Sequence, residues 1–147
     1  MSEGSHDGGQ GEREDVRAGL DYLGKEFPGL PILLGGFSFG AWVGLLVGCE
    51  DERVKSVMGL GIPVEDSDLS YLRGCGKPKL LVQGAKDPFG SRAKVEMLFD
   101  ELAEPKKLVF VEHADHFFTG HLSEMAAAID KWLDETYPEL RSSSAGP

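Results

Sequence analysis

Short runs that are mostly apolar alternate along this chain with longer stretches in which apolar residues recur at helical spacing. The runs predict strands at residues 31–34, 54–60, 79–83 and 107–111. The spaced stretches predict helices at residues 12–27, 39–47, 91–102 and 122–137. Because strand and helix alternate throughout, the pattern predicts an α/β fold of about four parallel strands flanked by helices, joined by right-handed crossovers.

The first strand and the helix after it are joined by Gly36-Phe37-Ser38-Phe39-Gly40, a G-x-S-x-G pattern. In this context the pattern predicts a nucleophile elbow, a sharp turn that presents the serine hydroxyl beyond the carboxyl edge of the sheet. Glycines suit both flanks because a strained turn leaves little room for side chains. The chain has 20 glycines, so a plain strand-to-helix turn with an incidental serine is the competing interpretation.

Two more loops at the same predicted edge carry the groups that a serine nucleophile needs. Asp87 follows the third strand, and His116 lies in the loop after the fourth. Reactive side chains in open α/β sheets gather on such loops, so both should approach Ser38. A neutral imidazole can accept the serine proton, and a carboxylate can hold that imidazole in the required tautomer.

Both assignments have rivals in the sequence. Asp87 could simply form a turn beside the proline that follows it, and Asp115 is the alternative acid, although it adjoins His116 and would need an awkward turn. His113 suits packing at a strand end, and His121 suits a capping or solvated position at the start of the last helix. We prefer His116 because it lies deep in its loop, before an aromatic pair.

With the order Ser38, Asp87, His116, the chain resembles the α/β-hydrolase superfamily, in particular the small cap-less serine esterases related to dienelactone hydrolases. The resemblance covers about residues 4–137 and includes an A-D-H-F motif that ends at Phe117. It implies that these three residues act as nucleophile, acid and base. It also implies that the backbone N–H of the residue after the nucleophile, Phe39, is an oxyanion donor.

The segment between the second and third strands, residues 62–76, is where relatives commonly insert a cap. It is too short here for a full cap, and a single helical turn is predicted at residues 68–72. A shallow, open site of this kind suits small acyl groups. Its expected walls are Phe37, Phe39, Tyr71 and Phe117.

Compared with intact members of that superfamily, the chain begins late, because no strand is predicted before the helix at residues 12–27. Relatives carry a second oxyanion donor in that part, so Phe39 is the one donor predicted here. The strand at residues 31–34 would form an exposed sheet edge, which favours pairing with another chain. We therefore expect a homodimer or higher homo-oligomer with its interface near the Ser38 strand.

Composition indicates one soluble globular domain, at residues 11–138, between a flexible start at 1–10 and a disordered tail at 139–147. A net charge of −10 argues against nucleic acid and anionic membranes as partners. Cys49 and Cys75 lack metal-site spacing, and we expect two reduced thiols and hence a cytoplasmic location. The N-terminal residues have no apolar stretch that would form a secretory signal or a membrane span.

The sequence thus predicts a hydrolase of small carboxylic esters that works through an acyl-serine intermediate on Ser38. No metal or cofactor is implied. Two alternatives remain open: thioester or lactone hydrolysis by the same residues, and a catalytically silent fragment that acts as an interaction module.

Overall fold

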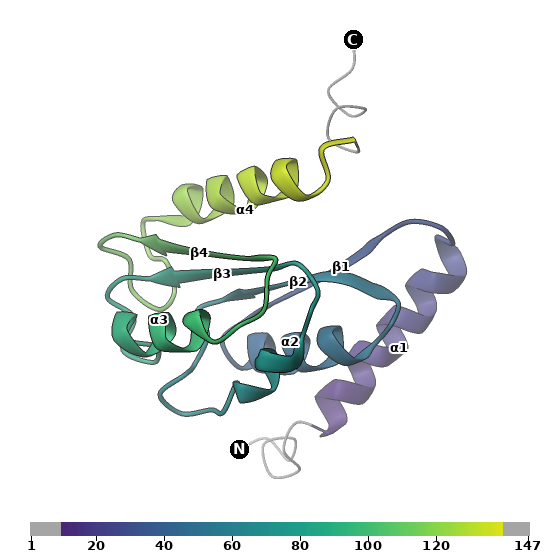
Figure 1. The fold of residues 1–147 in the computed structure, drawn as a ribbon, viewed down its shortest axis with the longest axis horizontal. Helices are drawn as coiled ribbons and strands as arrows, with labels where there is room; N and C mark the ends of the chain where they lie inside the picture. Colours follow the sequence, from purple (N-terminus) through teal and green to yellow (C-terminus); the bar gives the residue numbers. More distant parts are fainter. Residues whose placement is uncertain (1–9, 140–147) are drawn as a thin grey trace.

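The computed structural model describes residues 10–139 and contains one four-stranded sheet in the order β1-β2-β3-β4 (Figure 1). The strands are β1 (Ile32–Phe37), β2 (Val54–Leu60), β3 (Lys79–Gly84) and β4 (Lys106–Val111). The helices are α1 (Gln10–Glu26), α2 (Phe39–Glu50), α3 (Arg92–Asp100), α4 (Leu122–Thr136) and the short 3₁₀ helix η2 (Ser70–Gly74). Every neighbouring pair of strands is parallel. The predicted α/β fold of four parallel strands flanked by helices is confirmed.

Several element boundaries differ from the predicted ones. β1 continues through Gly35 and Gly36 because both pair with β2, although their residue type suggested a turn. η2 begins at Ser70, two residues later than predicted, and the Ser70 N–H donates to the side chain of Asp68 at 2.9 Å. Gln10, which we placed in the flexible start, is the first residue of α1. Residues 1–9 and 140–147, which make up most of the two predicted terminal segments, lie outside the described residues.

The two faces of the sheet are covered unequally. One face carries α2, α3 and η2, with α1 packed on α2, and α4 lies on the opposite face (Figure 1). Since α4 packs on β3 and β4, the apolar side chains of β1 and β2 on its side remain only half-buried; they are Leu33, Met58 and Leu60. Parallel sheets are normally buried on both faces. Within residues 10–139, no strand pairs with the outer edge of β1.

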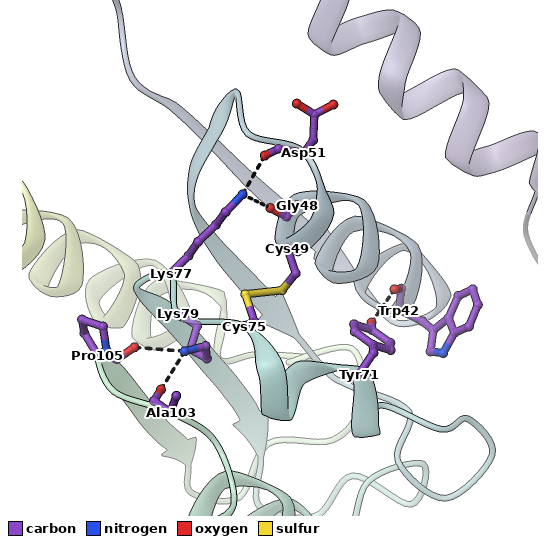
Figure 2. Close-up of a disulfide and its surroundings, with 10 residues drawn as sticks. All are labelled: Trp42, Gly48, Cys49, Asp51, Tyr71, Cys75, Lys77, Lys79, Ala103 and Pro105. Carbon is purple, nitrogen blue, oxygen red and sulfur yellow. Dashed lines mark hydrogen bonds between the residues drawn. A yellow bond between two sulfur atoms is a disulfide. The ribbon is translucent and has the colours of Figure 1, made fainter.

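A disulfide joins Cys49 in α2 to Cys75, the residue after η2 (Figure 2). The prediction of two reduced thiols is therefore wrong, and the cysteine argument for a cytoplasmic location no longer holds, because disulfides persist mainly in oxidising compartments. Lys77 strengthens the same junction, since its Nζ donates to the carbonyls of Gly48 and Asp51, each at 2.6 Å. The end of α2 is thus tied to the segment that follows η2.

None of the helices in the described part of the chain is both long and apolar enough to cross a membrane.

Candidate active site

Ser38 occupies a strained turn between β1 and α2, with φ 56° and ψ −124°. Its N–H donates to the carbonyl of Leu60 at 3.0 Å, which fixes the turn to β2. Glycine is required at Gly36, where a Cβ atom would overlap the backbone of Gly40 and Ala41. The steric expectation for the second flank is wrong, because a Cβ on Gly40 would meet nothing within 4 Å.

His116 lies between the serine and a buried carboxylate. Its Nε2 is 2.9 Å from Oγ of Ser38, and its Nδ1 is 2.7 Å from Oδ2 of Asp87. Because the carboxylate accepts at Nδ1, the proton of a neutral ring lies there and leaves Nε2 free to accept from the serine hydroxyl. His116 and Asp87 are both buried, and Ser38 is partly exposed. The structure therefore brings together all three side chains that the sequence singled out.

The Asp87 carboxylate is held on both of its oxygens. Oδ1 accepts the backbone N–H of Phe89 at 2.7 Å, and Oδ2 accepts from Nε2 of Gln83 at 3.2 Å as well as from His116. Asp87 therefore also forms a turn, as its competing interpretation predicted, because its bond to the Phe89 N–H closes the loop. Gln83 was not predicted; its signal is an amide that directly follows three apolar residues of a strand.

Asp115, the alternative acid, shapes the loop that carries the histidine. Its Oδ1 accepts the backbone N–H groups of Thr119 and Phe117, each at 3.0 Å. These bonds, above all the one from Thr119, lower the pKa of Asp115. Its carboxylate is thus engaged by the loop backbone, and the histidine ring bonds to Asp87 instead.

The two rival histidines lie elsewhere. His113 is exposed in a turn with φ 68°, and His121 bonds through Nδ1 to Oε1 of Glu124 at 2.7 Å, at the start of α4. Among residues 10–139, His116 is the histidine bonded to Ser38.

Three phenylalanines surround the His116 ring. The centroids of Phe37 and Phe117 are both 5.0 Å from it, and that of Phe89 is 4.7 Å away. All three are also open to solvent, so they form an apolar, accessible rim around the histidine ring. Phe89 was not predicted, although its place two residues after Asp87 in a strand-end loop was a usable signal.

Phe39 and Tyr71, the other two predicted wall residues, both contact Trp42 of α2. The Phe39 ring stacks on Trp42 with centroids 5.9 Å apart. Tyr71 donates its hydroxyl to the carbonyl of Trp42 at 2.6 Å, beside the disulfide (Figure 2). Burial raises the pKa of this phenol. The structure does not bring Tyr71 to the His116 ring, because η2 holds it against α2.

No group of three histidine, cysteine or acidic side chains within the described residues is arranged to hold a metal ion.

Comparison with known proteins places this geometry in a family context. The alpha/beta hydrolase domain family matches residues 13–139. An uncharacterised protein of Rickettsia prowazekii (strain Madrid E) is 30% identical over 141 residues, which cover 90% of this chain and 59% of that protein.

Solved structures share the same fold. A putative α/β hydrolase of unknown function from Agrobacterium tumefaciens superposes with a TM-score of 0.81 at 24% identity, over 88% of this chain and 62% of that one. An α/β serine hydrolase homologue from Coxiella burnetii superposes with a TM-score of 0.73 at 29% identity, over 85% of this chain and 57% of that one. An α/β serine hydrolase without a lid from Xanthomonas campestris superposes with a TM-score of 0.77 at 25% identity, over 88% of this chain and 58% of that one. The chain thus spans 57% to 62% of the length of these relatives.

Proposed function

The chain belongs to the α/β hydrolase family, and we propose that it is a serine hydrolase that cleaves small carboxylic esters through an acyl-serine intermediate. The observation that carries the proposal is the hydrogen-bonded series from Ser38 through His116 to Asp87. Two of the solved relatives are described as serine hydrolases or their homologues, which supports the same chemistry here.

In the proposed reaction, Oγ of Ser38 attacks the ester carbonyl carbon while Nε2 of His116 takes the hydroxyl proton. The resulting imidazolium returns that proton to the leaving alkoxide, and the ester C–O bond breaks to give an acyl-serine and an alcohol. Water then attacks the acyl carbon while Nε2 of His116 takes its proton. The bond between the acyl carbon and Oγ breaks, the imidazolium returns the proton to Oγ, and the carboxylic acid leaves. Asp87 holds the ring in place through Nδ1 in both steps.

The proposed oxyanion donor is the backbone N–H of Phe39. Phe39 is the first residue of α2, and the first N–H groups of a helix have no partner within it. They also lie at the positive end of the helix dipole. The loss of one such donor lowers kcat by about 10²- to 10³-fold in serine hydrolases.

The proposed substrates are esters with short acyl groups. Phe37, Phe89 and Phe117 border the His116 ring and are partly exposed, which offers apolar contact without a deep channel for a long chain. Thioesters and lactones present the same carbonyl to the same groups and remain alternative substrates. The ratio of kcat/KM values for an ester and a matched thioester distinguishes these classes.

We also propose that the protein self-associates through β1. The outer edge of this strand is unpaired within residues 10–139, and the half-buried face that carries Leu33, Met58 and Leu60 adjoins it. A second copy related by a two-fold axis would pair both edges at once, which closed symmetric dimers commonly do. The same apolar face favours the second candidate function, a catalytically silent module that binds a partner.

The direct test of hydrolase function compares the wild-type protein with Ser38→Ala on p-nitrophenyl acetate and longer esters. We expect turnover by the wild type, highest for short acyl groups, and its loss in the variant. An inactive wild type in its folded state would favour the silent module.

A further inference from the structure

Gln83 is a fully buried amide in the most buried strand of the sheet. Its neighbours in β3 are apolar and equally buried; they are Leu80, Leu81 and Val82. A buried amide is costly unless its donors and its acceptor are all satisfied. The contacts of this side chain therefore indicate what it does.

Two of its hydrogen bonds hold the loop after β2. Oε1 of Gln83 accepts the N–H of Ile62 at 2.8 Å, and Nε2 donates to the carbonyl of Ile62 at 3.1 Å. Nε2 also donates to the carbonyl of Gly90 at 3.1 Å. A Cβ atom on Gly90 would collide with this Nε2, so the glycine leaves the space that the amide occupies.

The remaining contact is with the carboxylate of the candidate site. Nε2 of Gln83 lies 3.2 Å from Oδ2 of Asp87, the oxygen that also accepts from Nδ1 of His116. An amide can accept from Ile62 through its oxygen and has two N–H bonds to donate, which the three oxygens around Nε2 share. A carboxylate at this position could not donate, and a lysine could not accept.

We propose that Gln83 is a positioning residue that acts through Asp87, an inference that rests on the proposed function. Its N–H and the Phe89 N–H fix both carboxylate oxygens, so that Oδ2 faces the ring of His116. The carboxylate thereby keeps its hydrogen bond to Nδ1 of His116. This bond holds the ring with Nε2 directed at Ser38.

A double-mutant cycle tests whether Gln83 acts through Asp87. Gln83→Met, which keeps the length of the side chain and removes its donors, should lower kcat/KM on p-nitrophenyl acetate by about 10²-fold, with KM little changed. The same change made on top of Asp87→Ala should add no more than about twofold, because the group through which Gln83 acts is gone. Equal losses in both backgrounds would overturn the proposal.

Ser56→Ala is the matched control. Ser56 is likewise fully buried and polar, in β2, and its Oγ bonds to the hydroxyl of Tyr137 at 2.8 Å. Its removal should lower the thermal midpoint and leave kcat/KM unchanged. If Gln83→Met does not fold, Gln83→Asn is the second variant, because it keeps a buried amide and shortens the side chain by one methylene. The shorter side chain withdraws the N–H from Asp87, so kcat should fall here as well.

A readout without turnover separates this inference from the proposed function. The nitrogen-15 shifts of the His116 ring report which nitrogen carries the proton, and the wild type should show it on Nδ1. Gln83→Asn and Gln83→Met should move both ring nitrogens toward a mixture of tautomers. Unchanged shifts would overturn the role of Gln83. Changed shifts in a protein without esterase activity would keep that role and reject the proposed function.

Discussion

Nε2 of His116 lies 2.9 Å from Oγ of Ser38, although the two residues are 78 positions apart in the chain. The serine follows β1 and the histidine follows β4, and these strands are the two outer strands of the sheet. Their contact therefore depends on the loops that extend across the carboxyl ends of β2 and β3. Chemistry at the serine should respond to changes in each of these loops.

Replacement of the histidine should be as damaging as replacement of the serine. His116→Ala should lower kcat/KM on p-nitrophenyl acetate by about 10⁴-fold or more, because no other group takes the serine proton. His113→Ala and His121→Ala are the controls and should keep activity within about threefold, since surface changes away from such features are usually small. Our assignment of the base fails if either control abolishes turnover.

Asp87 should act through the tautomer of the imidazole. Asp87→Asn presents an amide to Nδ1 and favours a proton on Nε2, so kcat should fall by about 10⁴-fold. Asp115→Asn should keep most of the activity, because Asp115 bonds to the loop backbone. Steady-state kinetics compare kcat of the two variants. A larger loss of kcat in Asp115→Asn than in Asp87→Asn would identify Asp115 as the acid.

The disulfide should contribute to stability more than to catalysis. Cys49→Ser opens a loop with a sequence separation of 26, a change expected to lower the free energy of unfolding by about 3 kcal/mol. The thermal midpoint should then fall by about 10 °C in calorimetry. Cys49→Ser with Cys75→Ser should show the same fall, as should the reduced wild type. A midpoint that is insensitive to reduction would contradict the bridge.

Self-association should depend on the face that α4 leaves half-buried. At micromolar concentration, light scattering after size exclusion should give a multiple of the chain mass, 15.9 kDa. Leu33→Lys puts a charge on this face and should yield monomers. Met97→Lys, a change at an exposed residue of α3, should leave the assembly intact. A stable, active wild-type monomer would contradict the proposed interface.

Local patterns in the sequence predicted most of the fold. The apolar run at residues 54–60 coincides with β2 at both ends, because one buried stretch between turn-forming residues leaves little choice. The predicted first strand stops at residue 34 because Gly35 and Gly36 are turn-favouring residues, whereas β1 continues through both. Their place in the strand depends on pairing with β2, which is a tertiary contact.

The chemistry-bearing residues were found because each follows a strand. Ser38, Asp87 and His116 could be grouped from strand order alone, since parallel strands end at one edge. The Cys49–Cys75 bridge and the contact of Tyr71 with α2 depend instead on how η2 packs. Gln83 belongs to no motif, and its role depends on contacts with Ile62, Asp87 and Gly90 that only the folded chain brings together.

Covalent labelling of Ser38 by a serine-reactive fluorophosphonate, read by mass spectrometry of the intact protein and its peptides, tests the central claim most directly. We predict stoichiometric modification on the peptide that carries Ser38, and its loss in His116→Ala, since the hydroxyl reacts only when its proton is accepted. Absence of labelling in a folded wild-type sample, or labelling that persists unchanged in His116→Ala, would contradict the account.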